Sequence, residues 1–398
     1  MTDPRALWGH LYDRYHPATP RQRRILACDG GGIRGIITVE VLRVLERKLA
    51  AATGAGDGFR LCQWFDFIGG TSTGAIIAAA LARGRSVAEV ADFYRGFGTT
   101  AFTKRQWYER WRSLYGDGPL KQKLQEVYGA NATLEPQHLE TLLLVVTHNA
   151  TTDSAWPISS NPDAKYNDPT RPDCNLRIPL WQLVRASTAA PVYFPPEVIR
   201  WDPTNPEKTF TFRDGGLDYN SPAFLMARMA TDPAYRLNWP KGEGNLLVVS
   251  VGTGSAPALG ATPDDPETNL ISEAKHSLMV VMNQAQLDQD INCRTVGRCS
   301  FGPFLDREVD DLVPRAGSLP VPLSQDLGRA FLYARYDNEL TRAGLDRLGL
   351  KNIDPARISK MDSTAAIDEL TAIGQALARQ VDLAHFGSFV QHPGIPTP

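Results

Sequence analysis

Residues 64–82 read WFDFIGGTSTGAIIAAALA, and this stretch decides the fold class. Its first part, Trp64–Ile68, is a short apolar run of the kind that forms a buried β-strand. After a glycine-rich turn, the small and apolar residues Thr73–Ala82 predict a helix that is closed by Gly84. A buried strand that turns directly into a helix indicates an α/β fold with a parallel sheet.

The same alternation continues along much of the chain. Short apolar runs at residues 24–29, 142–147, 209–213 and 245–251 predict further buried strands. The helix expected after the first of these runs has one apolar face, made of Ile37, Val41, Val44, Leu45 and Leu49. Strands that alternate with helices predict a mainly parallel sheet that is covered on both faces.

The regions outside this pattern differ in composition. Residues 1–21 predict an N-terminal extension with a short amphipathic helix, which either docks on the main body or serves as a membrane-surface or regulatory helix. Residues 152–179 contain five prolines and predict a long loop. From residue 256 to 391 the pattern is mostly helical, and residues 392–398 predict a disordered tail.

Composition excludes several classes of protein. The 398 residues are 42% hydrophobic and 22% charged with a net charge of −2, which argues against a wholly disordered chain and against a nucleic acid polymer as partner. The five cysteines form no CxxC pair and favour a reducing compartment. Neither a membrane-spanning apolar stretch nor a secretory signal is evident, so the expected location is the cytoplasm.

Ser72 lies at the centre of the strand-to-helix turn, within Gly70-Thr71-Ser72-Thr73-Gly74. A GxSxG pattern in this context is typical of a nucleophilic serine whose hydroxyl projects above the edge of a sheet. Small neighbours permit the sharp turn, and the N–H groups that begin the helix favour a developing negative charge. The alternative is a tight turn with an inert serine.

A second glycine-rich turn, Asp29–Gly35, follows the first predicted strand and reads DGGGIRG. It contains the GxGxxG fingerprint of dinucleotide-binding proteins. That interpretation requires an acidic residue at the end of the next strand, about 20 residues further on, and Asp57 does not end a strand. Consecutive glycines can instead direct backbone N–H groups at an oxyanion. Arg34 would then orient the loop, attract anionic lipid head groups or simply face solvent.

A third motif, Asp214-Gly215-Gly216, follows the apolar run at residues 209–213. Its aspartate is either a turn residue or a base for Ser72. The usual partner of a catalytic serine is an imidazole, and only His148 is expected near this edge of the sheet, where an ordinary strand-end histidine is the simpler interpretation. Asp214 is then the remaining base. A free aspartate has a pKa near ~3.9, and a drier setting would raise it.

These three motifs, in this order, resemble those of the patatin-like phospholipases. Residues 185–195, ahead of the aspartate, and the strand and turn at residues 249–254 are also similar to that family. The similarity covers roughly residues 22–255. The C-terminal region, including residues 333–336 and 360–362, resembles that of bacterial stand-alone members.

The resemblance implies a three-layer α/β/α fold, with residues 22–255 as the catalytic domain. It also implies hydrolysis of phospholipid acyl esters through a serine–aspartate dyad and an acyl-enzyme. Ser72 would be the nucleophile and Asp214 the proton acceptor. The oxyanion hole would be formed by Gly30, Gly31 and Gly32, and the supporting motif positions would be Arg34, Gly35, Gly70, Gly74, Gly215 and Gly216. No metal and no other cofactor is expected.

The implied partner is the surface of a phospholipid membrane, contacted peripherally. Aromatic and arginine side chains interleave at residues 105–112 and are candidates for that contact, unless a helix packs these aromatics inward. The loop at residues 152–179 is a candidate lid.

Some related bacterial enzymes are anti-phage effectors that cyclic nucleotides switch on. A cyclic nucleotide activator and a role in antiviral defence are therefore further candidates, while the oligomeric state stays open. Three alternatives are an esterase acting on neutral lipids or small esters, a nucleotide-binding protein that uses the loop at residues 30–35, and a regulatory module without catalysis.

Overall fold

The structure is a computed structural model that describes residues 3–101, 116, 118–255, 270–305, 328–359, 362 and 364–390. Within these residues nine strands form one sheet in the order β5-β6-β3-β2-β1-β7-β9-β8, and β4 pairs with β3 outside this order. The strands are β1 Arg23–Cys28, β2 Phe67–Thr71, β3 Leu142–Asn149, β4 Ser154–Ser159, β5 Glu197–Arg200, β6 Thr209–Asp214, β7 Leu246–Val251, β8 Arg298–Phe301 and β9 Leu332–Tyr336.

The centre of the sheet is parallel and one of its margins is antiparallel. Strands β3, β2, β1, β7, β9 and β8 pair in parallel, whereas β4 and β6 run antiparallel to β3, and β5 runs antiparallel to β6. In the register of β3, Val146 pairs with Thr71 and the next residue, Thr147, pairs with Asp214, so that β2 and β6 follow one another along one edge of β3 while β4 pairs with the other edge. The residue after β2, Ser72, and the last residue of β6 are thus brought to the same place at the edge of the sheet.

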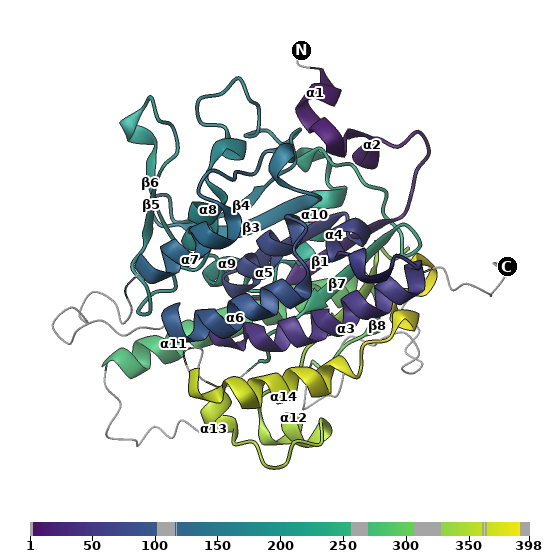
Figure 1. The fold of residues 1–398 in the computed structure, drawn as a ribbon, viewed down its shortest axis with the longest axis vertical. Coiled ribbons are helices and arrows are strands. Elements are labelled where there is room, and N and C mark those ends of the chain that lie inside the picture. Colours follow the sequence, from purple (N-terminus) through teal and green to yellow (C-terminus); the bar gives the residue numbers. More distant parts are fainter. Residues whose placement is uncertain are drawn as a thin grey trace.

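Alternating side chains of each strand enter two separate cores. In β1, Leu26 and Cys28 belong to the larger core, whereas Ile25 and Ala27 belong to the core on the other face. Helices α3, α5 and α8 cover the first face, and α10 covers the second. Figure 1 shows α14 lying along the outer side of α3, so that the C-terminal region packs on this layer. The architecture is therefore a three-layer α/β/α sandwich, as the sequence predicts.

The helices surround this sheet, and Figure 1 shows their order from the purple N-terminus to the yellow C-terminus. Their bounds are α1 Pro4–Trp8, α2 Tyr12–Tyr15, α3 Gly35–Thr53, α4 Leu61–Trp64, α5 Thr73–Ala82, α6 Val87–Ala101, α7 Gly118–Tyr128, α8 Leu180–Ser187, α9 Gly216–Tyr219, α10 Ala223–Thr231, α11 Leu270–Val296, α12 Arg342–Arg347, α13 Pro355–Ile358 and α14 Ile367–Ala378. The apolar stripe of the N-terminal extension packs on the main body, where Trp8, Leu11 and Tyr15 are buried in the second core.

The prediction of a long loop at residues 152–179 is wrong in its first part, because residues 154–159 form β4. Pro157 lies opposite Val146 in an antiparallel pair with β3, and a proline is tolerated there because β4 pairs on one side only. The side chain of Trp156 packs against Trp201 and Phe212, with ring centroids 5.2 and 5.7 Å apart. This packing places Trp156 in an aromatic cluster rather than on a free lid.

Two other elements differ from the sequence prediction. The strand expected at residues 64–68 begins instead at Phe67, because Leu61–Trp64 forms the short helix α4. The C-terminal region was expected to be mostly helical, but it also contributes β8 and β9 to the central sheet. Arg335 interrupts the apolar run of β9. Because charged residues are rarely buried without partners, a run that contains one is not expected to form a buried strand.

Some expectations fall on residues outside the described ranges. These are the aromatic and arginine cluster at residues 105–112 and the tail at residues 392–398. Within the ranges that the structure does describe, no helix is both long enough and apolar enough to cross a membrane.

We expect Gly74→Ala to destabilise the protein, because a Cβ at residue 74 would lie 2.1 Å from the carbonyl oxygen of Cys28 in β1. Backbone atoms cannot rotate away, and overpacking of this kind costs about 1–3 kcal/mol. Urea unfolding followed by circular dichroism measures the loss.

The matched control is Gly244→Ala, where a Cβ would meet nothing within 4 Å. It should change the free energy of unfolding by less than about 0.5 kcal/mol. Equal stability of Gly74→Ala and the wild type would contradict the close packing of α5 on β1.

Candidate active site

Ser72 occupies a strained position between β2 and α5. Its φ of 54° and ψ of −122° lie in a region that serine rarely adopts. The turn is possible because Gly70 and Gly74, two residues to either side of Ser72, lack side chains: a Cβ at Gly70 would lie 2.1 Å from the carbonyl oxygen of Gly74. Tight packing of the turn against itself and against β1 therefore holds Ser72 at the carboxyl edge of the sheet.

The hydroxyl of Ser72 is hydrogen-bonded to the carboxylate of Asp214. Ser72 Oγ donates to Asp214 Oδ2 at 2.6 Å, and the backbone N–H of Gly216 donates to Asp214 Oδ1 at 2.8 Å. The exposed fraction is 7% for Ser72 and 1% for Asp214. Both oxygens of the carboxylate are thus oriented, and the pair is removed from bulk water.

Burial changes the chemistry of this aspartate. It raises the pKa of Asp214 to about 6, although the hydrogen bonds from Ser72 and Gly216 and the charge of Arg185 oppose the rise. A carboxylate whose pKa is nearer to neutrality is a stronger base than an exposed aspartate once it is ionised. The pair can therefore activate a serine hydroxyl in a way that a free aspartate cannot.

The end of α8 holds both members of the pair. The Ser72 N–H donates to Ser187 Oγ at 2.9 Å, and Ser187 Oγ donates to the carbonyl of Val146 in β3 at 2.6 Å. Two residues further on, the carbonyl of Ala189 accepts a hydrogen bond from the Asp214 N–H at 3.1 Å. The sequence drew attention to residues 185–195 without assigning a role to Ser187, which lies within that stretch.

The glycine loop Gly30–Gly32 packs directly beside Ser72. A Cβ at Gly30 would lie 3.2 Å from Ser72 Cβ, and one at Gly31 would lie 2.1 Å from Thr253 Oγ1. Thr253 Oγ1 also donates to the Gly30 carbonyl at 2.7 Å. The φ of Gly32 is 62°, a left-handed value that favours glycine. Side chains fill the space beside this loop, which argues against a bound dinucleotide phosphate.

Arg34 braces the loop from within and does not face solvent. Its exposed fraction is 3%, and its Nε donates to the carbonyl of Gly31 at 3.3 Å. Burial lowers the pKa of Arg34 to about 10, so the guanidinium remains charged at neutral pH. This burial rules out the alternative roles as a solvent-facing side chain and as a direct contact for lipid head groups.

The remaining motif glycines lie where other groups approach closely. A Cβ at Gly35 would lie 2.7 Å from Thr73 Oγ1, and one at Gly215 would lie 2.2 Å from the carbonyl oxygen of Val146. At Gly216 a Cβ would lie 2.6 Å from Met282 Cε. The structure thus brings all three sequence motifs together around Ser72.

A small, largely apolar pocket of about 40 Å³ opens beside this pair. Ser72, Asp214 and Gly32 line it together with apolar and aromatic side chains, namely Ile76, Leu120, Ala190, Tyr193, Phe194 and Met282. None of these lining residues comes from the candidate lid at residues 152–179. The pocket suits an apolar chain attached to a group that the serine could attack.

Two other expectations concern histidine and metal. His148 Nδ1 lies 2.9 Å from Asp218 Oδ2 and its Nε2 lies 3.4 Å from Asp153, so this histidine has carboxylate partners of its own. Among the described residues there is no group of three or more His, Cys, Asp or Glu side chains placed to hold a metal ion.

A family model described as patatin-like phospholipase matches residues 26–227, about half of the chain. The chain belongs to this family. The matched region contains the glycine loop, Ser72 and Asp214. All three motifs named in the sequence analysis therefore lie within the family match.

Several characterised proteins are similar to this member of the family. It is 30% identical over 251 residues to the cGAMP-activated phospholipase of Vibrio cholerae, a match covering 58% of this chain and 64% of that protein. It is 28% identical over 254 residues to the 85/88 kDa calcium-independent phospholipase A2 of Rattus norvegicus, covering 60% of this chain and 28% of the relative. It is also 30% identical over 270 residues to Patatin-16 of Solanum tuberosum, a match covering 61% of this chain and 64% of that protein. The chain thus spans less than two thirds of the length of these relatives.

We expect Ser187→Ala to weaken the site, because the buried N–H of Ser72 would lose its acceptor. An unsatisfied buried donor costs about 1–3 kcal/mol of stability. The turn would also be less well held, so the rate at which a fluorophosphonate labels Ser72 should fall. Urea unfolding and mass spectrometry of the labelled peptide measure the two effects.

Ser160→Ala is the matched control, since Ser160 Oγ accepts a hydrogen bond from the backbone N–H of Leu143 at 2.8 Å at a different place in the sheet. It should lower stability by a similar amount and leave the labelling rate unchanged. Equal labelling rates for Ser187→Ala and Ser160→Ala would refute the positioning role of Ser187.

Proposed function

We propose that this protein is a lipid acyl hydrolase that cleaves acyl esters of membrane phospholipids through Ser72 and Asp214. The observation that carries the proposal is the 2.6 Å hydrogen bond between these side chains at the wall of an apolar pocket. Family membership and the phospholipase names of the relatives support it.

The first half-reaction forms an acyl-enzyme. Asp214 accepts the proton of the Ser72 hydroxyl as Oγ attacks the ester carbonyl carbon. The backbone N–H groups of Gly31 and Gly32, with the positive end of α5, stabilise the oxyanion of the tetrahedral intermediate, whereas the Gly30 N–H is bonded to the carbonyl of Asn220. When the intermediate collapses, the bond to the leaving alkoxide breaks and Asp214 returns its proton to that oxygen, releasing a lysophospholipid.

The second half-reaction frees the fatty acid. A water molecule loses a proton to Asp214 and attacks the acyl carbon, and the same N–H groups stabilise the second oxyanion. Collapse of this intermediate breaks the bond to Ser72 Oγ, which takes the proton back from Asp214. The dyad therefore returns to its starting state, and the scheme uses no group other than those of the chain and water.

The apolar lining of the pocket supports an acyl chain as the group to be released. Its walls are apolar at Ile76, Leu120, Phe194 and Met282, and its polar groups are concentrated at the dyad. Burial of methylene groups against such walls stabilises binding by about 0.8 kcal/mol each. Neutral lipids and small esters carry the same reacting group, so they are the second candidate class of substrate.

Two partners complete the proposal. The substrate is part of a membrane, so the protein would act from the cytoplasm by peripheral contact with a phospholipid surface. The Vibrio cholerae relative is named as activated by cGAMP, which supports a cyclic nucleotide as activator here and a role in antiviral defence.

The test compares the wild type with Ser72→Ala and Asp214→Asn on mixed phospholipid vesicles, with and without cGAMP. We expect both variants to lose at least about 10³-fold in released fatty acid, because members of a catalytic unit act together. Liquid chromatography with mass spectrometry quantifies the fatty acid and the lysophospholipid.

Ser160→Ala, whose hydroxyl lies outside the site, should match the wild type. Hydrolysis by Ser72→Ala equal to that of the wild type would disprove the assignment of the nucleophile. Hydrolysis of neutral lipids or short esters, but not of vesicles with or without cGAMP, would favour the second class of substrate. Release of fatty acid only when cGAMP is present would support the activator.

The activity should rise with pH to a plateau, with a midpoint near 6. Only the ionised carboxylate of Asp214 can accept a proton, and burial raises the pKa of Asp214 to about 6. Below this pH kcat/KM should therefore fall about tenfold per pH unit. Initial rates on a soluble chromogenic ester between pH 4.5 and 8 measure the profile, over the range in which circular dichroism shows folded protein.

Asp29 is the appropriate control for this profile, because burial also raises the pKa of its carboxyl to about 6. The Asp29→Asn variant should keep the same midpoint whatever its maximal rate. A rate that does not change between pH 4.5 and 8 would contradict the assignment of Asp214 as the base.

A further inference from the structure

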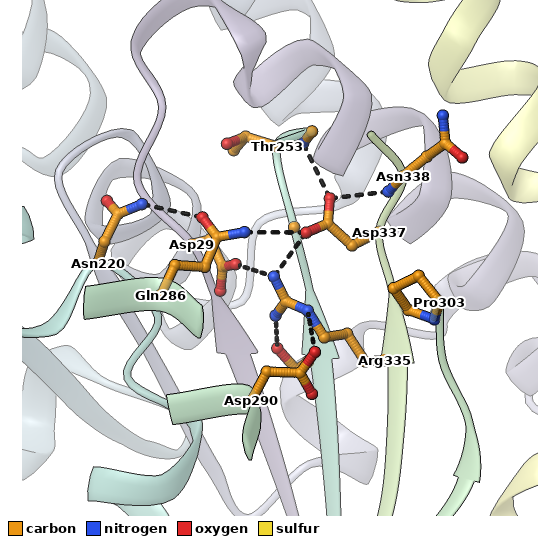
Figure 2. A network of polar contacts seen from close by, with 12 residues as sticks. Asp29, Asn220, Thr253, Gln286, Asp290, Pro303, Arg335, Asp337 and Asn338 are labelled. Carbon is orange, nitrogen blue, oxygen red and sulfur yellow. Dashed lines mark hydrogen bonds and ion pairs between the residues drawn. The ribbon is translucent and has the colours of Figure 1, made fainter. Parts of the chain in front are cut away.

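Arg335 is a buried arginine near the end of β9, and its guanidinium joins three carboxylates. Figure 2 shows this group with the side chains around it. Arg335 Nη2 donates to Asp29 Oδ2 and to Asp337 Oδ2, both at 2.6 Å, and Arg335 Nε lies 3.6 Å from Asp290 Oδ2. The exposed fraction of Arg335 is 1%. This ionic cluster lies inside the protein and joins Asp29, of the second glycine-rich motif, to residues that the sequence analysis gave no role.

The first contact leads directly to the glycine loop. Asp29 immediately precedes Gly30, and its side chain is fully buried. The Asp29 N–H donates to the carbonyl of Val251 in β7 at 3.1 Å, while its carboxylate is held by Arg335 in β9. Two neighbouring strands therefore fix the residue at which the loop begins.

The second contact reaches the same loop by another route, which Figure 2 also shows. Gln286 Nε2 donates to Asp337 Oδ2 at 3.0 Å, and Gln286 Oε1 accepts from Asn220 Nδ2 at 3.0 Å. The backbone carbonyl of Asn220 accepts the Gly30 N–H at 2.9 Å. The path from Arg335 through Asp337, Gln286 and Asn220 thus ends on Gly30.

A third route ends on the other side of Gly30. The second oxygen of Asp337 accepts the Gly254 N–H at 3.0 Å. Thr253, which precedes Gly254, donates a hydrogen bond from its hydroxyl to the Gly30 carbonyl at 2.7 Å. Both backbone groups of Gly30 and the carboxylate before it are therefore connected to one guanidinium.

Stability alone does not explain this cluster. Removing charges from water is costly, and buried ion pairs can often be replaced by apolar side chains without loss of stability. Their better-supported use is to select one arrangement of the groups that they connect. Here the connected groups are those that set the position of the Gly30 backbone.

We propose that Arg335 is a positioning residue, which holds the loop Gly30–Gly32 in the conformation that receives the oxyanion. The inference rests on the proposed hydrolase function and adds to it. It makes the C-terminal strand β9 a part of the catalytic apparatus, although no atom of Arg335 needs to touch the substrate.

The test uses Arg335→Lys and Asp29→Asn, with Arg294→Lys as the matched control. Arg294 is equally buried, in α11, and it pairs with Asp290 at 3.0 Å, so its loss disturbs the same cluster without a contact to Asp29. Hydrogen exchange of the peptide covering residues 29–34 reports on the loop. Values of kcat and KM on a soluble ester report on catalysis, and inhibition by a trifluoromethyl ketone reports on binding of a tetrahedral oxyanion.

We expect Arg335→Lys to exchange faster at residues 29–34, to lose about 10–100-fold in kcat and to bind the ketone more weakly by a similar factor. KM should change less than about threefold, because the apolar pocket is intact. Asp29→Asn should behave alike, and the double variant should lose little more than either single variant. Arg294→Lys should lose stability but keep kcat within about twofold of the wild type.

Several results would overturn the inference. These are an unchanged kcat in a folded Arg335→Lys, or a kcat loss in Arg294→Lys as large as in Arg335→Lys. If Arg335→Lys does not fold, Asp29→Asn decides: a wild-type kcat rejects the inference and a loss of kcat at constant KM supports it.

Failure of the proposed function has a different signature. In that case the wild type itself hydrolyses no ester, or Ser72→Ala hydrolyses as well as the wild type. Hydrogen exchange then decides the positioning role alone: faster exchange at residues 29–34 in Arg335→Lys or Asp29→Asn, but not in Arg294→Lys, supports it, and unchanged exchange in both rejects it.

Discussion

The contact on which the rest of the site depends is the one between the turn at Ser72 and the end of β1. The carbonyl oxygen of Cys28 lies 2.1 Å from the position that a Cβ of residue 74 would take, and the carbonyl oxygen of Gly74 lies equally close to that of a Cβ at residue 70. Only a chain without side chains at these two positions can pack in this way. That packing holds Ser72 at a positive φ and sets it against the glycine loop that follows β1. The proposed nucleophile and the proposed oxyanion loop are thus neighbours because two backbones touch.

In the proposed mechanism, desolvation supplies what an imidazole supplies in serine hydrolases that use a histidine. Asp214 ends β6, which runs antiparallel to β3, and this direction brings its carboxylate beside Ser72. Burial raises the pKa of the Asp214 carboxyl because it disfavours the charged form, and the hydrogen bonds from Ser72 and Gly216 partly oppose this rise. A base suited to neutral pH therefore arises from the position of an ordinary aspartate in the sheet.

Much of this was predictable from local sequence. The three glycine-rich motifs, the parallel strands and the helix Thr73–Ala82 follow from short apolar runs and turn residues, and the structure brings the three motifs together around Ser72. The strand β4 was missed because prolines suggest a loop, although a strand that pairs on one side accepts Pro157. Ser187 was missed because one hydroxyl among many carries no pattern. Arg335 did leave a signal, since a lone charge within the apolar run Leu332–Tyr336 requires buried partners.

Pairing of β9 with β7 has a consequence for the integrity of the polypeptide. A chain that stopped after residue 255 would keep every motif of the family and yet leave β7 as an exposed edge that is apolar except for Ser250, and such an edge is prone to intermolecular strand pairing and aggregation. The truncated chain would also lack Arg335, so the buried carboxylate of Asp29 would lose the cation that neutralises it. We therefore expect the first two thirds of the polypeptide to need the last third in order to stay in solution.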